Sequence, residues 1–183
     1  MCYIKIIEIM IDAKGIKIMN SAIRLRRSIR KYKKDKPVTK EQLKGMVEAA
    51  MLAPSARNSR PWEFIVVTKR EALDKINEIH PHAPIETATA AIVVVAIPQE
   101  GLPEGFFPQD CGAATQNILI EAVEMGLGAC WCGIYPREER MESFASLFNI
   151  PKPKLPFCVI TIGYPDEAPD ARGFFEESKV SYI

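Results

Sequence analysis

The 183-residue chain has only two histidines, His80 and His82, and both fall in the Pro-rich stretch "HPHAP". No acid or thiol lies near them at the spacing of metal ligands, so the sequence favours loop histidines over a metal site. No Ser-His-Asp order suggests acyl transfer. We therefore expect neither a metal centre nor a protein nucleophile with its own base.

The chain also lacks a long apolar run, because no stretch reaches the roughly 18 residues of a membrane span. The first twenty residues have neither a clean apolar core nor a small-residue cleavage site, and Glu8 and Asp12 argue against a transit peptide. Met19 is a candidate true start. We expect residues 1–18 to be a dispensable extension before a single domain at 19–183; the alternative is an additional surface strand or helix.

Cysteine is present without a disulfide framework. The five cysteines show no C-x-x-C spacing. Cys130 and Cys132, on one face of a strand, would lie roughly 6.5–7 Å apart along it, a poor spacing for a disulfide. An odd count without a framework predicts reduced thiols in a cytoplasmic protein.

Net charge is also nearly absent, at +1, which argues against a general nucleic-acid binder. Positive charge is instead local, because the stretch from Arg24 to Lys36 holds eight Lys or Arg residues and one acid. A forked guanidinium suits phosphate oxygens, and Ser28 adds a hydroxyl donor. A local anion site is one interpretation of this cluster, and a solvated basic face is the other.

Apolar periodicity predicts alternating helices and strands. Thr39 with Gln42, and Thr68 with Glu71, form capping-box patterns that begin two helices. The expected helices are 39–53, 68–79, 109–125 and 137–149, and the expected strands are 61–68, 90–98, 129–135 and 155–165. This order predicts an α+β or α/β domain whose central sheet is covered on both faces.

Two further segments are candidates for ligand binding. "APSARNSRPWEF" (53–64) is a polar loop leading into a strand, suited to a flat heterocycle edge, although an ordinary polar turn explains it too. "GLGACWCGIYP" (126–136) puts small residues on a strand where a flat ligand could approach; the alternative is a core strand. The second segment is no dinucleotide fingerprint, because Trp131 replaces the third glycine and a strand follows rather than precedes it.

The order of the segments is more informative than any one of them. "RRSIRKY", "PSARNSRPW", "QDCGAATQN", "GLGACWCGIYP" and a late Arg172 occur in that sequence, and together they resemble the FMN-dependent nitroreductase family over about residues 20 to 180. The resemblance implies an α+β homodimer with a central mixed sheet, FMN at the subunit interface, and a domain-swapped C-terminal tail wrapping the partner.

The resemblance also implies a set of FMN-binding residues. One chain would hold the phosphate, ribityl chain and pyrimidine edge with Arg26, Arg27, Ser28 and Arg30. The other chain would line the isoalloxazine ring with Pro54, Ser55, Ala56 and Asn58. Backbone contacts along the ring would come from Trp131, Cys132 and Gly133, and Arg172 would complete the phosphate site. Phe106 and Phe107 are expected either in the ring's opposite wall or in the core.

The implied reaction is a ping-pong transfer of electrons from NAD(P)H through flavin N5 to a nitroaromatic, quinone or similar acceptor. The flavin carries the chemistry, so no catalytic side chain is expected. Arg60 and Gly173 depart from the family's usual residues, and the short stretch before "AAIVVV" implies an open site. The alternative is a flavin-binding or flavin-delivery protein with little turnover. We expect no nucleic-acid or membrane partner.

Overall fold

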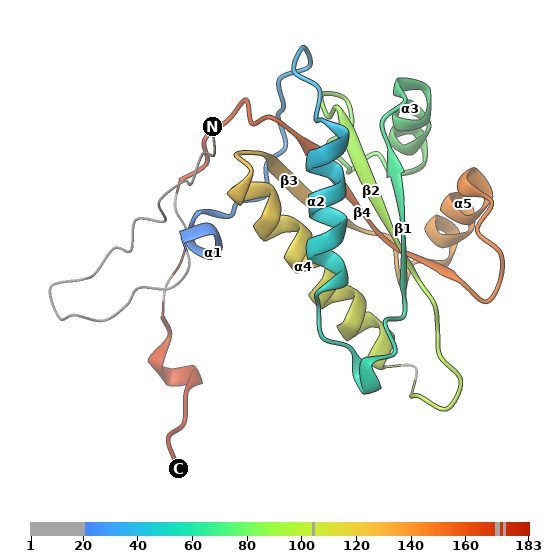
Figure 1. Ribbon diagram of the computed structural model, residues 1–183, viewed down its shortest axis with the longest axis vertical. Helices are drawn as coiled ribbons and strands as arrows, with labels where there is room; N and C mark the ends of the chain where they lie inside the picture. The colour runs from blue at the N-terminus through green and yellow to red at the C-terminus, as the bar shows by residue number, and fades with distance from the viewer. Residues whose placement is uncertain (1–20, 104, 171–172, 174) are drawn as a thin grey trace, which may run out of the picture.

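A computed structural model describes residues 21–103, 105–170, 173 and 175–183 and shows an α+β domain built on one four-stranded sheet (Figure 1). The strands are β1 (Trp62–Val67), β2 (Ala90–Ala96), β3 (Gly128–Gly133) and β4 (Leu155–Gly163), in the order β1-β2-β4-β3. β1 and β3 are therefore the edge strands. The predicted extension at 1–18 lies outside the described residues and stays a prediction.

Helices cover both faces of the sheet, as predicted. α2 (Lys40–Met51) and α4 (Phe106–Glu124) lie on one face, and α3 (Arg70–Ile79) and α5 (Glu138–Phe148) lie on the other (Figure 1). β2 is buried along its whole length, because Ile92 and Val94 pack toward α2 and α4 while Val93 and Val95 pack toward α3 and α5. This explains its continuous apolar run.

The sheet differs from the expected mixed pairing. All three strand pairs of the four-stranded sheet are antiparallel. Parallel pairing among the described residues is confined to an isolated bridge between Ser28 and Ala129. The apolar runs allowed either direction, because a strand that is buried on both faces has the same pattern in both kinds of sheet.

Two of three predicted helix ends are confirmed, namely the cap at Thr39 and the end before Gly126. Thr39 caps α2 through a complete capping box with Gln42, as predicted. The second predicted box is wrong: α3 is capped at Lys69 without a side-chain hydrogen bond. α4 begins at Phe106, three residues before the predicted start, and ends before Gly126, whose φ of 71° suits glycine.

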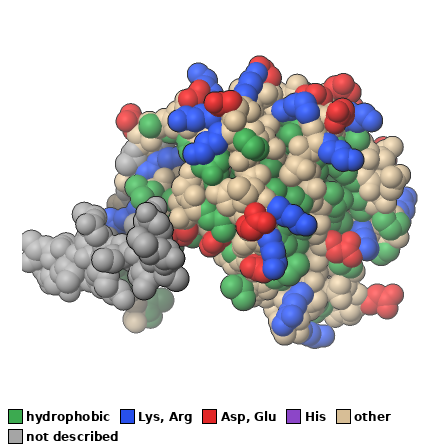
Figure 2. All heavy atoms as spheres, turned by 45° about the horizontal axis from the view of Figure 1, so that its top comes forward, with side chains coloured by type: hydrophobic (Ala, Val, Ile, Leu, Met, Phe, Trp, Pro, Cys, Tyr) green, Lys and Arg blue, Asp and Glu red, His purple; other side chains and the backbone are tan. Residues whose placement is uncertain are grey.

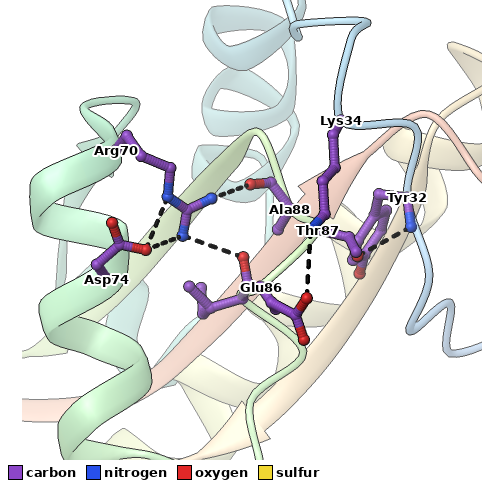
Figure 3. Close-up of polar contacts among 8 residues, drawn as sticks. Tyr32, Lys34, Arg70, Asp74, Glu86, Thr87 and Ala88 are labelled. Carbon is purple, nitrogen blue, oxygen red and sulfur yellow. Dashed lines mark hydrogen bonds and ion pairs between the residues drawn. The ribbon is translucent and has the colours of Figure 1, made fainter.

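A polar cluster fixes the segment between α3 and β2 (Figure 3). Arg70 of α3 bonds Asp74 at 2.9 Å and donates to the backbone carbonyl of Ala88 at 3.0 Å. Thr87 in turn accepts a hydrogen bond from the backbone N–H of Tyr32 at 3.1 Å. The cluster thereby connects α3 to the segment that carries the basic residues.

None of the helices in the described part of the chain combines the length and apolar character that a membrane crossing requires. The four described cysteines are free thiols, in agreement with the prediction of reduced cysteines.

Candidate functional site

The basic residues predicted to bind an anion line one cavity. After α1 (Ser21–Leu25) the chain is extended, and its side chains border a cavity of about 300 Å³. The lining consists of Arg26, Arg27, Ser28, Arg30, Glu167 and Pro169, and we call it the basic cavity. All four predicted residues of this segment are therefore brought together.

The basic segment is attached to the edge strand β3. The backbone N–H of Ile29 donates to the carbonyl of Ala129 at 3.1 Å, next to the Ser28–Ala129 bridge. Gly128 allows this approach, because a Cβ at that position would lie 2.8 Å from three side-chain atoms of Ile29. The glycine and the strand together place the basic cavity at the edge of the sheet.

Arg27 and Glu167 join the basic segment to the chain that follows β4. Arg27 donates from Nε to the carbonyl of Asp170 at 2.9 Å and from a terminal nitrogen to the carbonyl of Arg24 at 2.8 Å. The Glu167 carboxylate accepts from the backbone N–H groups of Arg30 and Lys31. Arg27 thus stabilises the backbone around the cavity. The side chain of Arg26, in contrast, makes no hydrogen bond among the described residues.

Sequence reasoning missed Glu167, because the stretch after β4 has no periodicity that would place it. The predicted Arg172 lies outside the described residues, so its role stays a prediction.

Beyond the bridge, β3 offers backbone groups on its outer edge. The backbone carbonyls of Ala129 and Gly133 point away from β4. The Ala129 carbonyl accepts a hydrogen bond from Ile29, and the Gly133 carbonyl accepts one from Arg140 at 2.9 Å. The direction of the backbone N–H and C=O groups alternates from one residue of a strand to the next. The backbone groups of Trp131 therefore also point away from β4. The residue Trp131 is 38% exposed, and its indole lies near Gly112 of α4. Trp131 is therefore available to a ligand at this edge.

Cys132 lies on the opposite face of β3 from Trp131 and is buried. Its thiol donates to the Cys130 thiol, with 3.9 Å between the sulfurs. That hydrogen bond, together with the Arg30 cation and against the effect of burial, lowers the pKa of Cys130 to about 7. A ligand on the exposed face could therefore meet Cys132 only through its backbone, and the predicted backbone contact with the ring stays a prediction.

His80 fixes the far end of this strand. Its Nε2 is 3.1 Å from the Gly133 carbonyl, and its ring meets Phe144 edge to face. Burial, with Arg140 nearby, lowers the pKa of His80 below its usual range. His80 is thus a buried structural residue, and the described residues contain no group of three or more His, Cys, Asp or Glu arranged for a metal ion.

The predicted ring-binding loop is a tight turn with its own support. Its 3₁₀ turn η1 (Ala56–Asn58) includes Arg57 and Asn58 at φ values of 52° and 54°, and Arg60 follows at 49°. Asp110 of α4 accepts the Ala56 backbone N–H at 3.0 Å. Sequence reasoning assigned Asp110 no role, because its partner Ala56 lies 54 positions away in the sequence.

Phe107 lies in the core, which is one of the two predicted alternatives, whereas a position of Phe106 in the ring's opposite wall stays a prediction. Phe107 is buried and packs edge to face on Tyr135 with ring centroids 5.3 Å apart, so it belongs to the core. Phe106 is 39% exposed and borders a second cavity.

Within one chain, the basic cavity and the η1 turn lie at opposite ends of α4 (Figure 1). Ala56 meets Asp110 in the first turns of the helix, while Ile29 meets Gly128 just after its end. Glu124 follows Asp110 by fourteen positions along the helix, which corresponds to about 21 Å at 1.5 Å per residue. The two parts are therefore separated by most of the length of α4.

The surface carries mixed charge. On the face in Figure 2, Lys and Arg side chains are interspersed with Asp and Glu side chains and form no broad basic patch. Lys34 pairs with Glu86 at 3.2 Å, and the Lys36 ammonium lies 3.7 Å from the Tyr164 ring centre. The lysines after Arg30 are thus surface residues, separate from the basic cavity.

The arrangement agrees with comparisons to known proteins. The model of the nitroreductase family matches residues 23–100 and 83–164. The chain is 45% identical over 176 residues to a protein of Methanothermobacter thermautotrophicus provisionally named NADH dehydrogenase/NAD(P)H nitroreductase, covering 95% of this chain and 92% of that protein.

Solved structures agree as well. An FMN-dependent nitroreductase from Clostridium difficile has a TM-score of 0.80 at 32% identity, over 90% of this chain and 98% of that one. A protein from Desulfovibrio desulfuricans, provisionally named a nitroreductase and solved in complex with FMN, has a TM-score of 0.76 at 28% identity, over 89% and 95% of the two chains.

Proposed function

The chain belongs to the nitroreductase family, and on that premise we propose that it is an FMN-dependent oxidoreductase that passes electrons from NAD(P)H to nitroaromatic, quinone or similar acceptors. The observation that carries the proposal is the basic cavity, in which Arg26 and Arg30 border the same space as Ser28 beside the open edge of β3. An anionic ligand with a flat ring fits such a place, since charge and an exposed strand edge adjoin there.

The residues present fit FMN. Arg26, Arg30 and Ser28 would donate to its phosphate, and Arg27 would hold the wall of the cavity through its bonds to backbone carbonyls. The ring would lie along β3, where the Trp131 backbone points outward. When bound, FMN supplies the hydride and electron transfer, so the protein needs no nucleophile or base of its own.

The chain's own contribution to the reaction is electrostatic and positional. The Arg30 guanidinium would stabilise the reduced, negatively charged form of the flavin, because a fixed cation stabilises a developing anion without reorganising. The bonds of Ile29 to Ala129, and of His80 and Arg140 to Gly133, hold β3 in place along the ring. The exposed face of Trp131 leaves room for an acceptor.

We further propose a homodimer in which Pro54, Ser55, Ala56 and Asn58 of one chain line the flavin held by the basic cavity of the other. The separation of these parts along α4 supports it. Phe175, Tyr182 and Ile183 in the tail are highly exposed, which fits a tail that packs on the partner chain.

The experiment is spectroscopic. The purified chain should be yellow with an FMN spectrum, and NADH or NADPH added without oxygen should bleach it quickly. A chain that takes up no FMN would contradict the proposal, and one that binds FMN without bleaching would be a flavin carrier instead. Arg26→Ala with Arg30→Ala should weaken FMN binding about a hundredfold at roughly 1.5 kcal/mol per lost charged hydrogen bond. The matched control is Lys33→Ala with Lys34→Ala, which removes the same charge outside the cavity.

A further inference from the structure

Two thiols of β3 lie side by side on the face of the sheet opposite the Trp131 side chain. Cys130 and Cys132 are two positions apart on this edge strand, and 3.9 Å separates their sulfurs. Both are free thiols. The proposed flavin chemistry uses neither sulfur, because the predicted contact of Cys132 with the ring is through its backbone. The pair is therefore free for other chemistry.

The geometry of the pair favours a bridging atom over a disulfide. A disulfide requires the sulfurs to come within about 2.05 Å of each other and the Cβ atoms within about 3.5–4.5 Å. Residues two apart on a strand lie roughly 6.5–7 Å apart along it, so the backbone opposes that approach. An atom with bonds of about 2.3 Å to sulfur at a tetrahedral angle, as zinc forms, holds two sulfurs about 3.8 Å apart. The observed separation of 3.9 Å agrees with such a bridge.

The surroundings restrict which atom can form the bridge. A zinc ion takes three or four protein ligands. Within the described part of the chain, no group of three or more His, Cys, Asp or Glu is arranged for a metal ion, so this place offers two thiols and no third ligand of these types. The bridging atom must therefore bring its remaining bond with it. A trivalent arsenic that already carries one organic group meets this condition, because it needs two sulfurs and no further ligand.

The pair lies just below the surface. Cys130 and Cys132 are 4% and 7% exposed, whereas the other two described thiols are 0% exposed. Cys130 also lies close enough to Arg30, an exposed residue of the basic segment, to feel its charge. An isolated bridge rather than a ladder joins that segment to β3. Segments held by few backbone bonds open locally at a low cost in free energy, so a small reagent can reach the sulfurs of the folded chain.

We propose that Cys130 and Cys132 form a binding site for monosubstituted trivalent arsenicals. With an arsine oxide, each thiol loses its proton and forms one S–As bond, the arsenic–oxygen double bond breaks, and the oxygen leaves as water with both protons. Arsenic stays trivalent, so no oxidant or reductant takes part. Part of Cys130 is thiolate at neutral pH, because its pKa is about 7, and the thiolate is the nucleophilic form.

The test uses phenylarsine oxide and the full-length chain, incubated with FMN and carrying Cys2→Ser, which removes the thiol outside the described residues. Mass spectrometry of the intact chain counts the bound phenylarsenic groups after an excess of the monothiol mercaptoethanol has been added. We expect one group per chain, which the monothiol leaves in place and the dithiol dimercaptopropanol removes. A bridge resists a monothiol, because the second sulfur holds the arsenic while the first is released.

Two variants locate the bridge. Cys130→Ser and Cys132→Ser each leave one sulfur, so the affinity for phenylarsine oxide should fall about a hundredfold or more. Cys111→Ala removes a buried thiol on the other face of the sheet, and as the matched control it should retain the bridge. Circular dichroism of each sample shows whether the variant is folded.

The proposal is overturned if the folded chain takes up no phenylarsenic group, if mercaptoethanol removes it, or if either serine variant retains it. The comparison of the two competing thiols needs no change at Cys130 or Cys132, so it decides the question even where a serine variant misfolds. FMN content is read from the absorption spectrum of the same samples. A chain that binds FMN and no arsenical contradicts this inference alone, and one that binds the arsenical and no FMN contradicts the flavin proposal alone.

Discussion

Glu167 is the acid among the described residues that line the basic cavity, where three arginines surround it. Its carboxylate accepts the backbone N–H groups of Arg30 and Lys31, so it holds the basic segment in place. The same negative charge repels any phosphate that enters the basic cavity. Retaining the acceptor while removing the charge would separate these two effects.

We therefore predict that Glu167→Gln tightens FMN binding about fivefold, because two like charges about 4 Å apart in a water-like medium repel by about 1 kcal/mol. Riboflavin, which has no phosphate, should bind equally to both proteins. Quenching of flavin fluorescence measures both affinities, and Glu86→Gln at a distant surface pair is the control. Weaker FMN binding by Glu167→Gln would show that the charged form is needed to shape the cavity.

At the residue scale, the sequence predicted the donors and missed the acids. Arg26 and Arg30 were visible because charge was concentrated in a short stretch. Glu167 and Asp110 were not, since each acts on a backbone group far away in sequence: Glu167 on Arg30, and Asp110 on Ala56. Contacts across more than fifty residues depend on the folded arrangement, which local patterns do not contain.

At the scale of elements, the basic segment is held against β3 by one small residue. A methyl group at Gly128 would lie 2.8 Å from the Cβ, Cγ1 and Cγ2 atoms of Ile29. Ile29 is β-branched and stiff at χ1, so it has little freedom to rotate away. The backbone of the basic segment would have to move instead.

We predict that Gly128→Ala lowers the free energy of unfolding by about 1–3 kcal/mol, the usual effect of overpacking, and weakens FMN binding as well. Denaturant unfolding and flavin titration measure the two effects. Adding Ile29→Ala should restore part of the FMN affinity, because it removes two of the three clashing atoms, Cγ1 and Cγ2, and leaves a backbone freer to relax around the remaining Cβ. Gly105→Ala, where an added Cβ meets nothing within 4 Å, should be nearly neutral. Equal losses in the single and double variants would contradict the explanation.

The elements themselves were largely predictable, since all eight expected helices and strands are present. The exceptions have physical reasons. α4 extends back to Phe106 because Phe107 packs on Tyr135, and Pro108 is tolerated in a first turn whose N–H groups need no helical partner. The prediction that Thr68 caps α3 is wrong, because the N-cap position is occupied by Lys69, one residue later.

At the scale of the whole molecule, the basic cavity and the η1 turn are separated by most of the length of α4. A symmetric pair of chains would bring the basic cavity of each next to the turn of the other. Each flavin would then need both chains. If one chain carried a defective part, the partner chain could supply an intact copy of that part to one of the two sites.

We predict complementation between two defective variants. Arg26→Ala with Arg30→Ala removes the phosphate donors, and Asn58→Gly removes a ring-side amide while suiting the φ of 54° there. Each variant alone should bind FMN poorly. When the two are co-expressed with different tags and the mixed pair is isolated, one site has both defects and the other has none, so about one FMN should bind per mixed dimer. If the two halves of each site belonged to a single chain, both sites of the mixed dimer would stay defective, and its FMN content would match that of the parent variants.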